Sequence, residues 1–134
     1  WREAGWLGAL AMAGLEPGPV LYGSWSVAWG REAMAQLITD ELPDAVVCGN
    51  DLIARGCADA LREAGIPSPA RVALTGFDNW TVVAEACRPV LTSVDMNLVQ
   101  LGAEAGHRMT EMIKGAAGSG TLRLPCTLVV RESS

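Results

Sequence analysis

The chain has 134 residues, which suffices for one compact domain or one lobe of a larger protein. Half of the residues are hydrophobic, and the formal net charge is −5. This negative charge argues against a nucleic-acid-binding surface on this chain, because phosphate binding requires clustered Lys and Arg. The uncharged run Ala4–Leu15 is too short to span a membrane and lacks the flanking charges of a signal peptide.

The four cysteines show neither a CxxC pair nor a metal-ligand spacing. Cys48 falls in an apolar strand and Cys57 on the apolar face of a helix, where cysteine acts as a small hydrophobe. We therefore expect reduced structural thiols in a cytoplasmic protein, and no metal site.

The first part of the chain predicts a helix over 1–14, whose small residues would allow close packing on a sheet. Pro19–Tyr22 is expected to form a short strand. Ser26 is a suitable N-cap for a helix from Val27 to about Thr39.

The segment 45–79 is the centre of the predicted fold. Two apolar strands, Ala45–Gly49 and Val72–Thr75, enclose an amphipathic helix that ends at Gly65. Asp51 is the expected N-cap of that helix. Strands that are apolar throughout are typical of a parallel sheet covered on both faces.

The remaining chain predicts a short helix over Thr81–Cys87, a crossing segment at Leu91–Val94, a long helix over Asn97–Lys114 and a terminal strand within Leu122–Val130. This alternation of helices and strands predicts a three-layer α/β/α domain with a mainly parallel sheet. The long helix carries a full apolar face made of Leu98, Leu101, Ala105, Met109, Met112 and Ile113.

Polar and aromatic residues follow three expected strands, and ligands bind at the carboxyl ends of strands in open parallel sheets. Candidate ligand-binding residues are Trp25, Asn50, Phe77 and Asp78, and Arg2 could reach the same edge. Carboxylate, guanidinium, amide and indole groups together suit a polyol. The structural alternatives are that Asp51 is only a cap, Asp78 a turn residue and Trp25 part of the core.

Catalysis would need a nucleophile with a base, a metal cluster or a phosphate loop, and none is evident. The single histidine, His107, falls on the polar face of the long helix. Asp51 and Asp78 could serve acid–base chemistry in principle, but no nearby residue supports that role. We expect no catalytic residues and no cofactor.

The order and spacing of short motifs make the whole chain resemble the lactose/galactose repressor family of bacterial transcription regulators. The resemblance implies the C-terminal lobe of a type I periplasmic-binding-protein-like fold, with a sugar or other small effector between two lobes. The matching segments are Arg2–Trp6, Ser24–Ser26 with Gly30, Asn50–Gly56, Gly65–Pro67, Val72–Asn79, Pro89–Thr92, Leu101–Gly102, Leu124–Pro125 and Leu128–Ser133.

The resemblance assigns effector contacts to Arg2, Trp25, Asn50 and Asp78. It places Phe77 and Asp51 beside the ligand, where their role is more often structural. The residue Trp80 departs from the family pattern and could narrow the mouth of the ligand site.

The resemblance also implies domain organisation and partners. Residues 1–134 would form the C-terminal part of an effector-binding domain, with helix 97–114 belonging to an N-terminal lobe that is otherwise absent. The DNA-binding helix-turn-helix is absent from this chain, so operator DNA would be bound by the missing domain. We expect a homodimer, formed through the helix after Asp51 and the apolar segment after Asn79, and no membrane contact.

The rival hypothesis is a secreted sugar-binding protein of a transport system with the same fold. An upstream helix-turn-helix would support the regulator, and a signal peptide the transport protein. Without the N-terminal lobe, we expect helix 97–114 to cover another part of its own lobe or to dock on a second copy, because exposed apolar side chains forfeit roughly 1.5–3 kcal/mol each.

Overall fold

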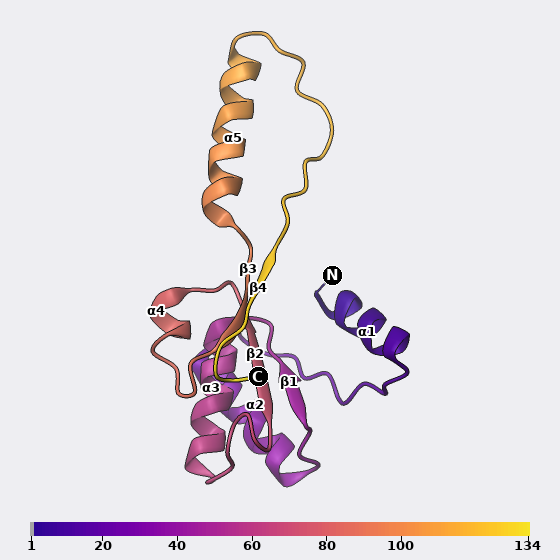
Figure 1. The fold of residues 1–134 in the computed structure, drawn as a ribbon, viewed down its shortest axis with the longest axis vertical. Helices are drawn as coiled ribbons and strands as arrows, with labels where there is room; N and C mark the ends of the chain where they lie inside the picture. Colours follow the sequence, from indigo (N-terminus) through magenta and orange to yellow (C-terminus); the bar gives the residue numbers. More distant parts are fainter. Residues whose placement is uncertain (1) are drawn as a thin grey trace.

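A computed structural model describes residues 2–134, which form an α/β lobe with a projecting arm (Figure 1). Four strands form one sheet in the order β1-β2-β3-β4. The strands are β1 (Ala45–Val47), β2 (Ala73–Phe77), β3 (Thr92–Asp95) and β4 (Thr127–Val129). The helices are α1 (Arg2–Ala13), α2 (Val27–Thr39), α3 (Asp51–Glu63), α4 (Thr81–Ala84) and α5 (Leu98–Ile113).

The sheet is open and mostly parallel, as predicted. β1 pairs with β2 and β2 pairs with β3 in parallel, whereas β4 returns antiparallel to β3. β3 overlaps the predicted crossing segment Leu91–Val94, and β4 lies within the predicted terminal strand Leu122–Val130. The carboxyl ends of β1, β2 and β3 therefore lie at the same edge of the sheet.

Helices α2 and α3 pack against one another and cover one face of the sheet (Figure 1). Fully buried side chains from both helices and the strands form the core. Gly30 and Gly56 allow the close contact, since a Cβ on Gly56 would lie 2.2 Å from the Val27 carbonyl oxygen. The predicted Ser26 cap is confirmed, because its hydroxyl accepts the Trp29 N–H. Core side chains include Met34, Leu37, Cys57, Leu61, Val72, Leu74 and Leu91.

The expected covering of the second sheet face is not seen within residues 2–134. No residue of α1 is buried, and Met12 is 92% exposed, so the small-residue stripe does not lie on the sheet. On the uncovered face, Val47 remains exposed. The strand predicted at Pro19–Tyr22 is wrong. That segment has no hydrogen-bonded partner strand, because β1 is the edge strand and pairs only with β2.

Helix α5 projects from the end of the β3–β4 pair, away from the rest of the lobe (Figure 1). None of its residues is buried, and the six side chains of its predicted apolar face are all exposed. The expectation that this helix covers its own lobe is therefore wrong. Only Met96 and Asn97 separate β3 from α5, so the helix continues in the direction in which β3 leaves the lobe, away from α2 and α3 (Figure 1).

The cysteines are free thiols. Cys48, Cys57 and Cys87 are buried and Cys126 is exposed. The Sγ atoms of Cys48 and Cys57 are 3.9 Å apart, and the hydrogen bond between them, followed by burial, raises the pKa of the Cys48 thiol well above its usual range. A buried thiol with a raised pKa is poorly reactive, so Cys48 serves the core. No helix in residues 2–134 has the length and apolarity that crossing a membrane requires.

Candidate functional site

Four predicted site residues meet at the carboxyl edge of the sheet. The guanidinium carbon of Arg2 lies 3.9 Å from the centroid of the Phe77 ring and 5.7 Å from that of the Trp25 ring. Its Nη2 atom lies 3.6 Å from Asp78 Oδ1. We refer to Arg2, Trp25, Phe77 and Asp78 as the Arg2 cluster. These residues come from α1, the loop before α2, and β2 with the turn that follows it. The predicted proximity of Arg2, Trp25 and Asp78 is confirmed, although Trp25 does not follow a strand. Asn50, the fourth residue predicted to converge there, lies buried at the start of α3.

Gly49 and Met96 complete the surroundings of Arg2. The Arg2 Nη1 atom donates to the Gly49 carbonyl oxygen at 2.5 Å, and Nη2 lies 3.7 Å from Met96 Sδ. A Cβ atom on Gly49 would lie 2.8 Å from the Trp25 ring. Glycine is therefore required for Trp25 to pack against this turn. Sequence reasoning did not single out either residue, although a glycine directly before the Asn50-Asp51 turn is a usable signal.

The backbone conformation, the pKa and the exposure of Asp78 bear on its role in the site. Its φ of 107° lies in the left-handed region, which aspartate adopts more readily than most residues. Burial raises the pKa of its carboxyl group, the positive charge of Arg2 lowers that pKa, and the nearby Asp51 raises it. About a third of the Asp78 side chain remains exposed, so the carboxylate is accessible to a ligand.

The cap of α3 is Asn50, and not Asp51 as predicted. Asn50, in extended conformation, is the N-cap of α3, because its Oδ1 accepts the Ile53 N–H at 2.9 Å. The prediction of Asp51 as the cap is wrong. Asp51 is the first helical residue and is 1% exposed, and its oxygens accept the Ser93 hydroxyl at 2.5 Å and the Trp80 N–H at 2.7 Å. Its role is to join α3 to the turn after β2 and to β3.

Trp80 is the N-cap residue directly before α4 and is half exposed. Its backbone is fixed by Asp51, but its ring does not join the aromatic contacts that Arg2 makes with Trp25 and Phe77. The structure therefore places Trp80 next to the Arg2 cluster along the chain and outside its set of side-chain contacts.

A polar network centred on Asn79, the residue after Asp78, was not predicted as a unit. Asn79 binds Ser93 through its N–H, Asp95 through Nδ2 and Arg131 through Oδ1. Ser93 is fully buried in β3, and a polar residue in a buried strand is the signal that sequence analysis could have used. Its partners are 14 and 42 residues away, and no local pattern identifies them.

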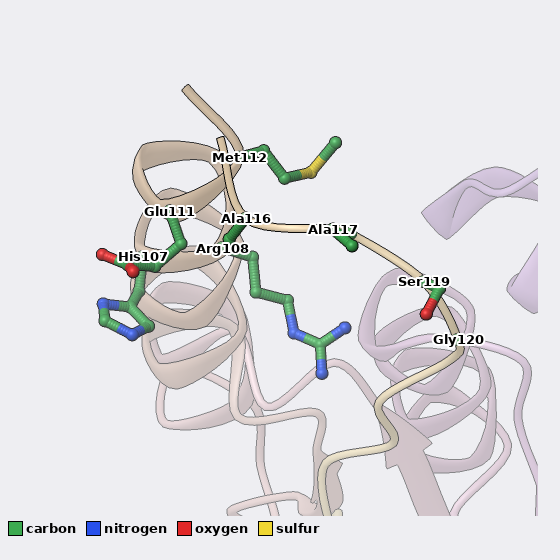
Figure 2. Close-up of a pocket in the computed structure, with 9 residues that line it drawn as sticks. His107, Arg108, Glu111, Met112, Ala116, Ala117, Ser119 and Gly120 are labelled. Atoms are coloured by element: carbon green, nitrogen blue, oxygen red, sulfur yellow. The ribbon is translucent and has the colours of Figure 1, made fainter. Parts of the chain in front are cut away.

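A separate cavity of about 460 Å³ lies between α5 and the loop that follows it (Figure 2). Arg108 extends towards the part of the loop that carries Ser119, and it pairs with Glu104 on its own helix. This cavity is far along the arm from the Arg2 cluster and shares no residue with it. Among residues 2–134, no group of three or more His, Cys, Asp or Glu side chains is arranged to hold a metal ion.

Comparison with known proteins identifies the family. The whole chain, residues 1–134, matches the family model described as a periplasmic binding protein-like domain. The chain is 29% identical to the HTH-type transcriptional repressor CytR of Escherichia coli over its full length, which corresponds to 40% of that protein.

Two solved structures share the fold over 99% of the chain. The Lac repressor bound to ONPG has a TM-score of 0.91 at 28% identity, with 40% of that chain covered. A CelR–cellobiose complex, a transcriptional regulator, has a TM-score of 0.89 at 34% identity, with 42% covered. The chain thus spans about 40% of the length of these relatives. It belongs to the periplasmic binding protein-like domain family, within the lactose/galactose repressor group.

Proposed function

We propose that this chain is the effector-sensing part of a bacterial transcription regulator, and that it binds a sugar or similar small polyol at the Arg2 cluster. The observation that carries the proposal is the position of the Arg2 guanidinium, which lies against two aromatic rings and near the Asp78 carboxylate. These groups occupy the sheet edge where ligands bind in open parallel sheets.

The chemistry of the cluster suits a sugar. The Asp78 carboxylate can accept hydrogen bonds from adjacent hydroxyls, and Arg2 can donate to ring or hydroxyl oxygens. Trp25 is 61% exposed and offers an indole surface for the apolar side of a sugar ring. Asn50 has its Oδ1 committed to the α3 cap, so its amide group is the part proposed to donate to the ligand. Phe77 supports Arg2, and Trp80 is proposed to narrow the approach.

In the whole protein, effector binding is proposed to alter DNA affinity through a DNA-binding segment beyond this lobe, which is a coupling between two sites. The relatives are transcription regulators, one of them in complex with cellobiose, which supports this function over the transport alternative. The same relatives support the proposal that the protein is cytoplasmic and has no enzymatic activity. A helix-turn-helix upstream of the lobe is the expected feature, and a signal peptide there would favour transport.

A homodimer is proposed through α3 and the segment after Asn79. Within that segment Val82 is 71% exposed, whereas Val83 and Ala84 belong to the buried side of α4. Of the three residues expected to form an apolar patch, Val82 is therefore the one that is exposed. One related structure is a Lac repressor dimer bound to operator. A monomeric mass of the full-length protein by light scattering would contradict the dimer.

The exposed apolar face of α5 is proposed to pack in the second lobe of the whole protein. Leu98, Met109 and Ile113 are 55%, 65% and 81% exposed. Side chains of this size stabilise a protein when buried, by roughly 1.5–3 kcal/mol each. In the full-length protein, Met109→Asp is expected to lower the Tm, and an unchanged Tm would contradict this packing.

The experiment that tests the function is a thermal-shift screen of the full-length protein with D-glucose, D-galactose, D-ribose, lactose and cellobiose. A ligand that binds only the folded protein raises its Tm, by an amount that grows with ligand concentration. We expect at least one sugar to raise the Tm of the wild type and to have little effect on Asp78→Ala. Equal Tm increases in both proteins would contradict the proposed site.

A further inference from the structure

The turn after β2 is held in an unfavourable conformation by hydrogen bonds. Asp78 and Asn79 have φ angles of 107° and 50°, which non-glycine residues adopt at an energetic cost. The Asn79 N–H donates to Ser93 Oγ at 3.0 Å, and the Asp78 N–H donates to the Val94 carbonyl oxygen at 3.0 Å. Both bonds lead from the turn to β3. The position of Asp78 therefore depends on that strand.

The Asn79 side chain bridges the two strands that connect the lobe with α5. Its Nδ2 donates to Asp95 Oδ2 at 3.0 Å, and its Oδ1 accepts from Arg131 Nη2 at 2.7 Å. Asp95 is the last residue of β3, and Arg131 follows β4. Since α5 lies between these strands in sequence, the chain enters the arm through one strand and returns through the other (Figure 1). The Asn79 side chain thus contacts both the strand that leads into α5 and the segment that follows the returning strand.

Further bonds fix the partners of Asn79. Arg131 donates through Nη1 to the Leu91 carbonyl oxygen at 2.7 Å and through its N–H to Thr92 Oγ1 at 2.8 Å. Asp95 Oδ1 accepts the Asn97 N–H at 2.6 Å, directly before α5. The hydrogen bonds from Asn97 and Asn79 lower the pKa of Asp95, which keeps its carboxylate ionised.

We infer that Asn79, Asp95 and Arg131 are positioning residues that tie the Asp78 turn to the direction in which β3 and β4 leave the lobe. A ligand that shifts Asp78 must shift the adjoining Asn79, and Asn79 can move only with both strands or by breaking its bonds to them. Ligand binding at the Arg2 cluster thereby alters the positions of β3 and β4 where they adjoin α5. This inference rests on the proposed function, because it requires a ligand at Asp78.

The alternative is that these bonds only stabilise the turn. Both roles predict some loss of stability when a bond is removed, so Tm does not separate them. The separating measurement is the response of the β3–β4 pair and α5 to a bound sugar. Hydrogen exchange measures this response segment by segment, because it reports local opening.

Two variants of the full-length protein remove the link by different means. Asn79→Gly removes the bridging side chain, and glycine tolerates the φ of 50° without strain. Arg131→Lys keeps the charge but cannot donate in two fixed directions to Asn79 and Leu91. Arg123→Lys, on the exposed loop before β4, is the matched control. The probe is whichever of D-glucose, D-galactose, D-ribose, lactose and cellobiose raises the wild-type Tm most.

Without sugar, we expect amide exchange in segments 95–97 and 127–131 to accelerate about tenfold in both variants, as loss of a hydrogen bond to a charged group implies. With sugar, the wild type and Arg123→Lys should change their exchange across 95–113. The two link variants should bind the sugar within about threefold of wild type, a difference below 1 kcal/mol, and lose most of that change.

Unchanged exchange in the variants without sugar would overturn the inference. So would a full sugar-induced change in Asn79→Gly. If no sugar binds the wild type, the proposed function fails and the ligand-dependent half of the inference fails with it. The sugar-free comparison still decides whether the three residues hold the strand pair.

Discussion

Asp51 and Ser93 meet through a 2.5 Å hydrogen bond in the buried centre of the lobe, one at the start of α3 and the other in β3. The second oxygen of Asp51 accepts the Trp80 N–H. A single carboxylate therefore holds together a helix, a strand and the turn that carries Asp78. Asp51 thereby fixes the relative positions of α3, β3 and the turn that carries Asp78, a member of the Arg2 cluster.

Asp51→Ala should destabilise the protein by about 2–5 kcal/mol, because it leaves the Ser93 hydroxyl and the Trp80 N–H without their acceptor. Urea unfolding monitored by circular dichroism measures this change. Asp44→Ala is the control, since the exposed Asp44–Arg71 pair should contribute less than about 1 kcal/mol. Equal effects of the two substitutions would contradict the role given to Asp51.

The contact between α2 and α3 predicts a contrast between two glycines in helices. A Cβ on Gly56 would meet the Val27 carbonyl oxygen at 2.2 Å and the Arg31 nitrogen at 2.8 Å, both of them backbone atoms. Gly56→Ala should lower stability by about 1–3 kcal/mol or more through overpacking. Gly102→Ala, with open space around it on α5, should raise helix stability by about 0.5–1 kcal/mol. Urea midpoints that shift in the same direction for both variants would refute this contrast.

Much of the site was accessible to sequence reasoning because parallel strands end at the same edge. Phe77 and Asp78 lie at the end of β2, as that rule predicts. Trp25 was expected there after a strand that does not form, so its proximity to Arg2 follows the family resemblance instead. The cap of α3 was misassigned, because Asn50 and Asp51 are equally good N-caps and sit side by side.

Other features depend on contacts far apart in the chain. Pro19–Tyr22 has the composition of a strand, but strand formation needs a partner that local sequence does not reveal. The Asn79–Arg131 bond joins residues 52 positions apart. The periodicity of α5 predicted the helix correctly, yet it could not predict where the helix packs, because an apolar face does not specify its partner.

Substitution of Gly49 should weaken ligand binding more than it weakens the fold. In Gly49→Ala, the new methyl group would displace the exposed Trp25 ring, which can move without disturbing the core. We expect sugar affinity to fall about 2- to 10-fold, the range of a lost aromatic contact, with little change in Tm. Gly8→Ala, which has open space around it, is the control. A large Tm decrease with unchanged affinity would show that Gly49 serves the fold instead.

Acid should weaken sugar binding through Asp78. Burial raises the pKa of this carboxyl group above 3.8, so the folded protein favours its protonated form more than the unfolded chain does. Its contribution to stability is therefore present below pH 3.8 and is lost as the pH rises through the folded pKa. Sugar hydroxyls need the ionised carboxylate as acceptor, so affinity should fall as the pH decreases towards that pKa. In Asp78→Asn this pH dependence should disappear; calorimetric titrations at several pH values measure it, and persistence would assign it to another group.

The most direct test of the central claim is calorimetric titration of the full-length protein and its Asp78→Ala variant with the sugar that stabilises the wild type most. We predict a loss of about 10- to 100-fold in affinity, as expected when a charge-assisted hydrogen bond is removed. The Tm of the sugar-free protein should fall only modestly, because alanine adopts the φ of 107° less readily than aspartate. An Asp78→Ala variant that binds the sugar as tightly as the wild type would contradict the placement of the ligand at the Arg2 cluster.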